Sequence, residues 1–200
     1  MRLILASSSP RRREILKIIG LKNFEIIPPT GKELKVNSPK DVKANAILKA
    51  RSVERGLSCK GEYLIIASDT AVFVEKKFLG KPKDREEAKQ MLATLSGKWH
   101  TVYTAIGIIY RKFKKRVLKT HLDFARVKFK ELSDKEIEWY LSTEEPYDKA
   151  GAYGIQGFGA IFIEKIVGDY FTVMGISPSK LYKLLVNVLG KEKTLNLFSP

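Results

Sequence analysis

Residues 3–16 read LILASSSPRRREIL, and this stretch predicts how the chain begins to fold. The apolar run at 3–6 is typical of a buried strand. Pro10 suits the first position of a helix that Ser9 caps, because proline has no N–H to leave unpaired there. We expect this helix to end near Gly20, since glycine is common just past helix ends. A strand that leads directly into a helix favours an α/β fold.

The arginines that follow Pro10 are more than a helix start requires. The helix is expected to bury four aliphatic side chains: Ile15, Leu16, Ile18 and Ile19. At about 100° per residue, Arg11 and Arg12 fall at the borders of that face, whereas Arg13 points to solvent. Free backbone N–H groups, serine hydroxyls and a guanidinium at a helix start favour a phosphate site. The alternative is simple capping, with the arginines extending outward.

The bulk composition suits one globular domain over residues 1–200. Hydrophobic residues make up 44% of the chain, and no apolar stretch reaches the length of a membrane span. We expect no signal peptide, because Arg2 directly precedes a strand-like run. The single Cys59 excludes an internal disulfide, so a cytoplasmic setting is expected.

The net charge of +15 is the most unusual bulk feature. It favours polyanionic partners, either nucleic acid or small molecules that carry phosphate, through long-range attraction. The alternative is a lysine-rich solvated surface, as in many proteins adapted to heat.

Helices and strands are expected to intermix along the rest of the chain. Further helices are expected from Ser38 to about Gly56, from Asp84 to Gly97, from Ser133 to Ser142, and finally from Ser177 to Gly190. Strands are expected at 63–67, 71–82 with a turn around Lys76-Lys77, 100–110, 116–130 and 160–166, with another short strand after VGDY (167–170). This order predicts an α/β fold with a mixed sheet.

The motif IIASDT (65–70) places a carboxylate just past the expected end of a buried strand. Because α/β sheets hold active-site groups at that position, Asp69 is a candidate to bind a divalent metal or to activate water. Ser68 and Thr70 beside it can both form hydrogen bonds. The alternative is an aspartate that only forms a turn.

Three more charged residues are candidates. Lys49 interrupts the apolar stripe of the second expected helix, and such a lysine either extends to solvent or meets a buried anion. Lys81, in LGKP, is a similar candidate. Glu33 is a loop carboxylate without a distinct local signal.

A glycine-rich loop spans residues 144–160 (EEPYDKAGAYGIQGFGA), with glycines at 151, 154, 157 and 159. These glycines would let the backbone approach a ligand closely. The order GIQGFG does not match a dinucleotide fingerprint, and LSGK at 95–98 is not a P-loop. Gln156 could read the edge of a base, because its amide both donates and accepts, or it could be a turn side chain.

The two histidines and one basic run have simpler interpretations. His100 and His121 are too isolated for a metal site, and we expect each to pack on a strand. No Ser-His-Asp or Cys-His arrangement is evident. The run RKFKKR (111–116) is interpreted as a solvated hairpin turn, although it is the only local pattern that favours nucleic-acid binding.

Taken in order, several motifs resemble those of the Maf family of nucleotide pyrophosphatases: ASSSPRRREIL (6–16), KA (49–50), SDT (68–70), GKP (80–82), EEAKQMLATLSGKWHTVYTA (86–105) and PYDKAGAYGIQG (146–157). The resemblance spans nearly the whole chain. It implies an elongated α/β fold, with a mixed sheet flanked by helices, shared with the house-cleaning inosine-triphosphate pyrophosphatases. It also implies a homodimer that uses Mg²⁺ or Mn²⁺ to hydrolyse a nucleoside triphosphate to the monophosphate and pyrophosphate.

The resemblance further implies roles for single residues. The aspartate of SDT, here Asp69, is the family's proposed proton acceptor. The family's specificity positions fall on three residues: Arg11, Thr70 and Gln156. The lysines of KA and GKP and the loop glutamate fall on Lys49, Lys81 and Glu33.

The loop sequence also indicates a subfamily. DKAGAYGIQG is similar to members that act on dTTP and UTP, whereas the branch that acts on 7-methyl-GTP has a glutamate where Gln156 stands. A neutral amide suits the carbonyls and single N–H of a uracil or thymine edge, and a glutamate suits the donors of guanine. Ala71 departs from the family's usual β-branched residue, which should affect packing only.

The resulting hypothesis is a metal-dependent hydrolase of dTTP, UTP or a modified pyrimidine triphosphate. Cations and a hydroxyl would bind the triphosphate: Ser9, Arg11, Arg12, Lys49 and Lys81. Asp69 would orient water and, with Glu33, contact the metal. One alternative is the same reaction on 7-methyl-GTP or another purine triphosphate. An alternative of a different class is a nucleic-acid-binding regulator of cell division; no membrane partner is expected.

Overall fold

The computed structural model describes residues 1–21, 23–57 and 61–198, so Cys59 lies outside the described residues. The strands are β1 (Arg2–Ala6), β2 (Phe24–Ile26), β3 (Glu62–Val74), β4 (Lys77–Leu79), β5 (Trp99–Lys112), β6 (Lys115–Phe129) and β7 (Ile163–Val167). The helices are α1 (Pro10–Ile18), α2 (Pro39–Arg55), α3 (Arg85–Leu95), α4 (Asp134–Leu141), α5 (Tyr170–Met174), α6 (Pro178–Leu189) and α7 (Lys191–Leu195). Short 3₁₀ turns span Glu145–Asp148, Ala150–Ala152 and Phe158–Phe162.

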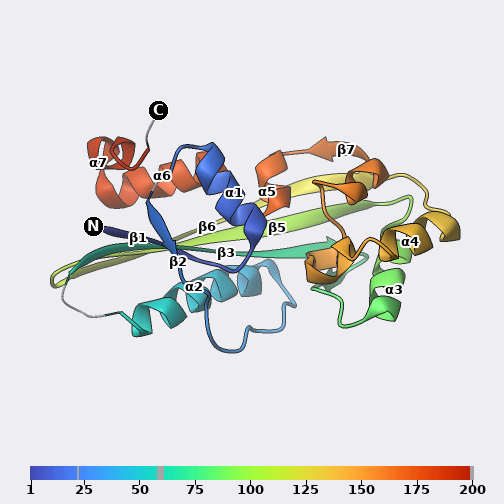
Figure 1. Cartoon of the computed structure of the whole chain (residues 1–200), viewed down its shortest axis with the longest axis horizontal. Coiled ribbons are helices and arrows are strands. Elements are labelled where there is room, and N and C mark those ends of the chain that lie inside the picture. Colours follow the sequence, from blue (N-terminus) through green and yellow to red (C-terminus); the bar gives the residue numbers. More distant parts are fainter. Residues whose placement is uncertain (22, 58–60, 199–200) are drawn as a thin grey trace.

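These strands form one mixed sheet in the order β2-β1-β3-β5-β6-β7, with β4 paired to β3. Strands β2, β1 and β3 run parallel to one another. The pairs β3–β5, β5–β6 and β6–β7 are each antiparallel. Figure 1 shows a long sheet with α1, α5, α6 and α7 over one face and α2 over the other. The predicted elongated α/β fold with a mixed sheet is therefore confirmed. Within the described residues, every helix is too short or too polar to cross a membrane.

The sheet is buried on both faces where its parallel strands meet. Leu3 and Leu5 of β1 pack with α1 and α6, whereas Ile4 and Ala6 point to the opposite face and join the cluster under α2. Strands buried on both faces read as continuous apolar runs, because neither set of alternating side chains meets water. This arrangement explains the runs LILA and YLIIA and confirms β3 as a central strand.

The predicted helix starts are confirmed because their signals are local. Ser9 and Pro10 begin α1, although the Ser9 side chain makes no capping hydrogen bond to the described residues, and Gly20, which follows the end of the helix, has a φ of 77°. Ser38 begins α2 with a capping box, in which the Asp41 carboxylate accepts the Ser38 N–H at 2.9 Å. The other predicted caps, at Asp84, Ser133 and Ser177, each accept a backbone N–H of the following helix.

Some predictions near helix ends are wrong. Ile18, one of the four predicted buried residues, is 62% exposed, because α1 ends there; Ile15 and Leu16 are buried, and Ile19 packs partly buried against the same core. The strand expected at 160–166 begins only at Ile163, since a 3₁₀ turn occupies the residues before it.

Two predictions in the last part of the chain are also wrong. The segment after VGDY is the helix α5, which Asp169 caps by accepting the Phe171 N–H at 2.9 Å, and not a strand. Gly175, with a φ of 114°, ends this helix after a single turn or so. The helix expected to be final, α6, is followed after Gly190 by α7.

His100 packs inside the protein, as expected for a strand residue. Its Nε2 lies 2.8 Å from the Tyr153 hydroxyl, and its ring meets Phe129 and Tyr153 edge to face. In the part of the chain that the structure describes, no three His, Cys, Asp or Glu side chains form a metal-binding group. Burial lowers the pKa of His100 from 6.5 to about 4.

We expect His100→Gln to make the protein more resistant to acid. The unfolded chain takes up a proton on His100 near pH 6.5, but the folded protein does so only near pH 4. Stability from the neutral imidazole is therefore complete above pH 6.5 and is lost as the pH falls toward 4. That loss is about 2 kcal/mol by pH 5. Urea unfolding at neutral and acidic pH measures it; an equal loss in the variant and the wild type would contradict the prediction.

Candidate active site

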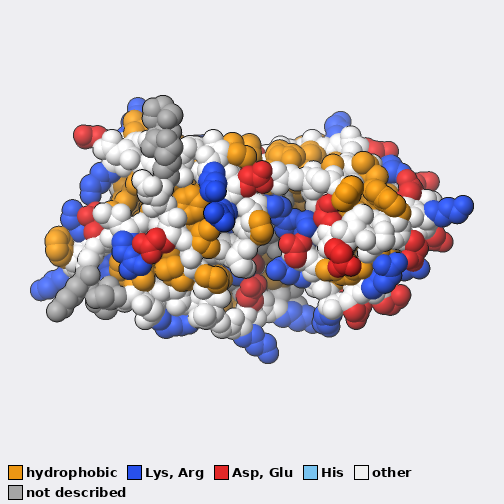
Figure 2. All heavy atoms as spheres, in the orientation of Figure 1, with side chains coloured by type: hydrophobic (Ala, Val, Ile, Leu, Met, Phe, Trp, Pro, Cys, Tyr) orange, Lys and Arg blue, Asp and Glu red, His pale blue; other side chains and the backbone are white. Residues whose placement is uncertain are grey.

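A cleft of about 1180 Å³ opens beside β3 at the point where β1 ends. Pairing with β1 stops at Ala6↔Ala67, and pairing with β4 begins at Val72↔Leu79. Within the described part of the chain, residues 68–71 of β3 therefore pair with no strand on this side, which leaves one edge of the sheet open to the cleft. Figure 2 shows basic and acidic side chains gathered around a hollow near the middle of the visible face.

Asp69 lies inside β3 and not past its end, so the expected strand end is wrong. The expected strands at 63–67 and at the start of 71–82 are one strand, because β5 pairs without a break from Glu62↔Lys112 to Phe73↔Thr101. What ends near Asp69 is the neighbouring strand β1. The carboxylate thus reaches an open edge, as it would at a strand end, but on a rigid backbone.

Asp69 and Thr70 point to opposite faces of the sheet, because side chains alternate along a strand. The Asp69 carboxylate meets Lys49 of α2, whereas the Thr70 hydroxyl meets Arg12 of α1. Ser68, on the same face as Thr70, donates to the Gly175 carbonyl at 2.6 Å. The cleft therefore wraps around the open edge and draws side chains from both layers of helices.

Lys49 lies between two carboxylates. Its Nζ is 2.6 Å from Asp69 Oδ1 and 3.1 Å from Glu33 Oε1. The Asp69 side chain is 7% exposed and Lys49 12%, whereas Glu33 is 56% exposed. Of the two alternatives for Lys49, the structure therefore shows the contact with a buried anion, the Asp69 carboxylate. Among the described residues, no hydrogen bond is made to Asp69 Oδ2, so this oxygen remains available to a ligand or to water.

Arg12 lines the cleft, but its guanidinium is held by the protein. It donates to the Gly175 carbonyl at 3.1 Å, to Ser7 Oγ at 3.3 Å and to Thr70 Oγ1 at 3.1 Å. Burial lowers the pKa of Arg12, and the nearby Asp69 carboxylate opposes that shift. Arg12 thus joins α1 to β3 and to the end of α5 while it keeps a positive charge beside the cleft.

The orientation of the Thr70 hydroxyl follows from its neighbours. Thr104 donates its hydroxyl proton to the Thr172 carbonyl at 2.7 Å, so in its 3.0 Å contact with Thr70 it must accept. Thr70 therefore donates to Thr104 and accepts from Arg12. Because its only proton points away from the cleft, Thr70 can offer a ligand an acceptor but no donor.

The other predicted site residues also lie at the cleft, but their side chains differ in how far they are exposed to solvent. Ser9 and Arg11, at the start of α1, are half-buried, whereas Lys81 is exposed at the rim. Gln156 lies next to the main cleft, in a smaller hollow of about 240 Å³. That hollow is lined by Pro10, Arg11, Glu145, Asp148, Lys149 and Gln156.

The glycines of the loop approach other parts of the protein closely. A Cβ on Gly151, whose φ is 71°, would lie 2.9 Å from Val72. A Cβ on Gly159 would lie 2.5 Å from the Gly154 carbonyl and 2.7 Å from the Tyr140 hydroxyl. The glycines thus allow the loop to pack closely against β3, α4 and itself.

Sequence reasoning missed several residues of the site. Ser7 binds Arg12, and Lys149 bridges the Asp148 carboxylate and the Glu145 carbonyl, each at 2.6 Å. Their positions gave some signal, because Ser7 begins the serine run, Asp148 and Lys149 belong to the DKAG sequence, and Glu145 lies just before it. Their contacts gave none, since those depend on how distant segments meet.

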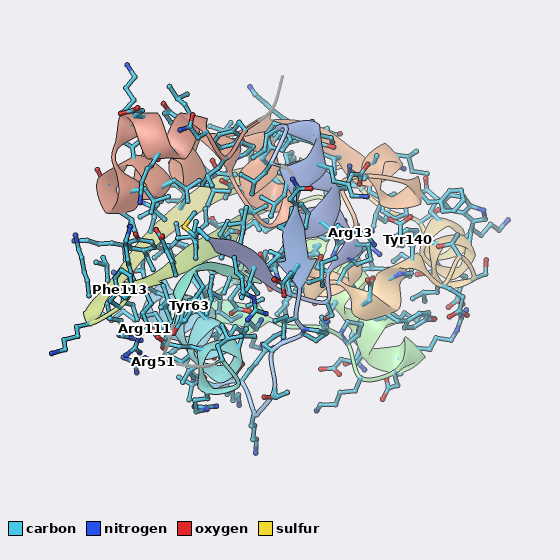
Figure 3. The ribbon with its side chains drawn as sticks, turned by 60° about the vertical axis from the view of Figure 1, so that its left-hand side comes forward. Arg13, Arg51, Tyr63, Arg111, Phe113 and Tyr140 are labelled. Carbon is cyan, nitrogen blue, oxygen red and sulfur yellow. The ribbon has the colours of Figure 1, made fainter. Side chains whose placement is uncertain are left out.

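The basic run 111–116 takes no part in lining the cleft. It forms the turn between β5 and β6, as predicted, and Phe113 at its tip is 74% exposed. Figure 3 shows Arg51, Arg111 and Phe113 together at the end of the molecule that carries this turn, well away from Tyr140. The local pattern that favoured nucleic-acid binding is therefore separate from the cleft.

Comparison with known families agrees with the motifs. Residues 2–188 match the family described as Maf-like protein. The chain belongs to the Maf family. Among Maf relatives, the dTTP/UTP pyrophosphatase of Aquifex aeolicus is 46% identical over 190 residues, which cover 92% of this chain and 94% of the relative. That of Carboxydothermus hydrogenoformans is 46% identical over 185 residues, which cover 92% and 97%. That of Thermotoga maritima is 42% identical over 192 residues, which cover 92% and 88%.

Proposed function

We propose that this Maf protein hydrolyses dTTP, UTP or a modified pyrimidine triphosphate to the nucleoside monophosphate and pyrophosphate. The observation that carries the proposal is the pairing of the buried Asp69 with Lys49 at the open edge of β3, inside a cleft lined by further cations. The names of relatives that share nearly half of the sequence support the same substrate class. We take residues 1–200 as a single catalytic domain.

The residues of the cleft suit attack by water at the α-phosphorus. Asp69 Oδ2 would orient the water and accept its proton, while the water oxygen bonds to the α-phosphorus. The bond from that phosphorus to the bridging oxygen breaks, and pyrophosphate leaves with the electron pair. Arg11, Lys49 and Lys81 would offset the negative charge of the triphosphate and of the leaving group. Such positioning and charge stabilisation supply most of the catalysis in phosphoryl chemistry.

The carboxylates of Asp69 and Glu33 fit a divalent cation, because both supply the hard oxygen ligands that Mg²⁺ and Mn²⁺ prefer. Both reach the same lysine ammonium, so their oxygens already converge on one positive charge. Two protein ligands would leave the remaining positions to water and phosphate oxygens, as is usual for Mg²⁺. When bound, the cation supplies charge neutralisation on the triphosphate.

The test of the reaction is to incubate the purified protein with a panel of nucleoside triphosphates and Mg²⁺ or Mn²⁺, and to identify the products. Pyrophosphate and a monophosphate are expected, with UTP and dTTP turned over faster than purine triphosphates. Release of orthophosphate and a diphosphate would overturn the reaction class. Faster turnover of 7-methyl-GTP than of UTP would overturn the substrate class.

We expect Gln156→Glu to reduce kcat/KM for UTP by about tenfold or more, because a carboxylate cannot donate to the uracil carbonyls. The same change should favour guanine nucleotides, whose edge offers donors. Competition between UTP and GTP in one assay measures the ratio directly. An unchanged ratio would remove Gln156 from base recognition.

We also propose an oligomeric state and a cellular location for the protein. The family resemblance supports a homodimer, and the single cysteine of the chain supports a cytoplasmic location. Sedimentation of the purified protein would measure its mass in solution, and a monomer at micromolar concentration would contradict the first point.

A further inference from the structure

The glycine-rich loop, residues 144–160, is built around one of its own carboxylates. Glu145 accepts the backbone N–H groups of Phe158 at 2.9 Å and Gly159 at 3.3 Å. It also accepts the hydroxyl of Tyr140 at 2.9 Å, and that hydroxyl oxygen accepts the Gly154 N–H at 3.0 Å. Tyr140 is fully buried in α4. Through these bonds, Glu145 ties the second half of the loop to the core.

Two glycines of the loop fit this carboxylate closely. A Cβ on Gly154 would lie 2.6 Å from Glu145 Oε1, and a Cβ on Gly157 would lie 2.6 Å from Oε2. Gly157 also has a φ of 87°, which residues with a side chain rarely adopt. The loop therefore passes so close to Glu145 that a side chain at Gly154 or Gly157 would displace the carboxylate.

Gln156 lies between the two points that are held. Gly154 is fixed on one side of it, through Tyr140, and Phe158 on the other, through Glu145. Gln156 lines the hollow of about 240 Å³ together with Arg11. Within the residues that the structure describes, the Gln156 amide makes no hydrogen bond to the protein, so it is free to bind a ligand.

We propose that Glu145 is a positioning residue for base selection, because it fixes the backbone on both sides of Gln156. The Gln156 amide then meets the edge of the base in one orientation, without the cost of ordering the loop at binding. This inference rests on the proposed function and adds the residue that holds its specificity position. A glutamine at position 145 cannot replace the carboxylate, because its NH₂ group would face a backbone N–H donor.

The experiment compares Glu145→Gln, Gln156→Ala and the double variant. We expect Glu145→Gln to raise KM for UTP by about tenfold, with a smaller change in kcat, and to lower the preference for UTP over GTP. Inorganic tripolyphosphate, which has no base, serves as a competitive inhibitor, and its inhibition constant should not change. In the Gln156→Ala background, Glu145→Gln should have little further effect on KM.

Glu144→Gln is the matched control. It removes the neighbouring carboxylate, which is exposed and makes no hydrogen bond to the described residues, and it should leave KM unchanged. Thermal unfolding shows whether each variant is folded at the assay temperature. Glu145→Asp, which keeps a carboxylate, should recover part of the preference for UTP.

Several results would overturn the proposal. One is a loss of tripolyphosphate binding equal to the loss of UTP binding, because the effect would then not concern the base. Another is an additive effect in the double variant, which would mean that Glu145 acts without Gln156. If the wild-type protein hydrolyses no nucleotide in the panel, the proposed function fails. Calorimetric binding of UTP then decides about Glu145 separately, and equal affinity in the wild type and Glu145→Gln would overturn its role.

Discussion

Replacing Asp69 by asparagine is expected to lower kcat for UTP by about 10³-fold. The asparagine amide fits the same space but can neither accept the proton of the attacking water nor carry the negative charge that binds Lys49 at 2.6 Å. The fold should remain, because Asp69 lies at an open edge and Lys49 keeps its contact with Glu33 at 3.1 Å. Single-turnover kinetics at saturating UTP would measure the loss separately from substrate binding.

Glu33→Gln is the natural comparison for this variant. Glu33 contacts the same lysine and would share the metal with Asp69, but it would not accept the proton of the water, so its loss should reduce kcat less than the loss of Asp69. Circular dichroism and thermal unfolding of both variants exclude a general loss of structure. Turnover by Asp69→Asn close to that of the wild type would remove Asp69 from the role of proton acceptor.

Replacing Gly159 by alanine is expected to lower the free energy of unfolding by about 3 kcal/mol or more. The new methyl group would lie 2.5 Å from the Gly154 carbonyl and 2.7 Å from the Tyr140 hydroxyl. One of these is a backbone atom and the other belongs to a fully buried side chain, so neither can move aside easily. Urea or thermal unfolding would measure the change.

Gly80→Ala is the control for this prediction. Apart from its chain neighbours, no atom of the described residues lies within 4 Å of a Cβ placed on Gly80, and its φ is not positive, so alanine should be tolerated there. The free energy of unfolding should then stay the same or rise slightly, since alanine restricts the unfolded chain. Equal stability of the Gly159→Ala and Gly80→Ala variants would contradict the close packing of the loop.

Much of the fold could be predicted because its signals are local. Ser38 and Ser133 each begin a helix with a capping box, and such contacts span only a few residues. Lys49 could be recognised as a candidate because a charge inside an apolar stripe is unusual, although the sequence left open whether it meets an anion or extends to solvent. The helix α5 could not be recognised, since five residues are too few to display a helical period.

The rest depends on contacts between distant segments. Whether β3 stops before Asp69 or continues past it is decided by β5, which lies more than thirty residues further along and pairs with it without a break. The sequence likewise could not show which residue the loop glycines contact, because Gly154 and Gly157 face the side chain of Glu145, about ten residues earlier in the chain. The glycine pattern indicated a tight loop, but only the structure identifies the atoms that require it.

The alternation of Asp69 and Thr70 across the sheet makes the alignment of two strands a condition of catalysis. If β3 slipped by one residue along β5, the carboxylate would turn toward α1 and the hydroxyl toward α2, which exchanges their partners. No side chain would need to be lost for the site to be destroyed. The long β3–β5 pairing therefore keeps the site residues in position as well as stabilising the fold. Substitutions in β5 far from the cleft can inactivate the protein by weakening this pairing.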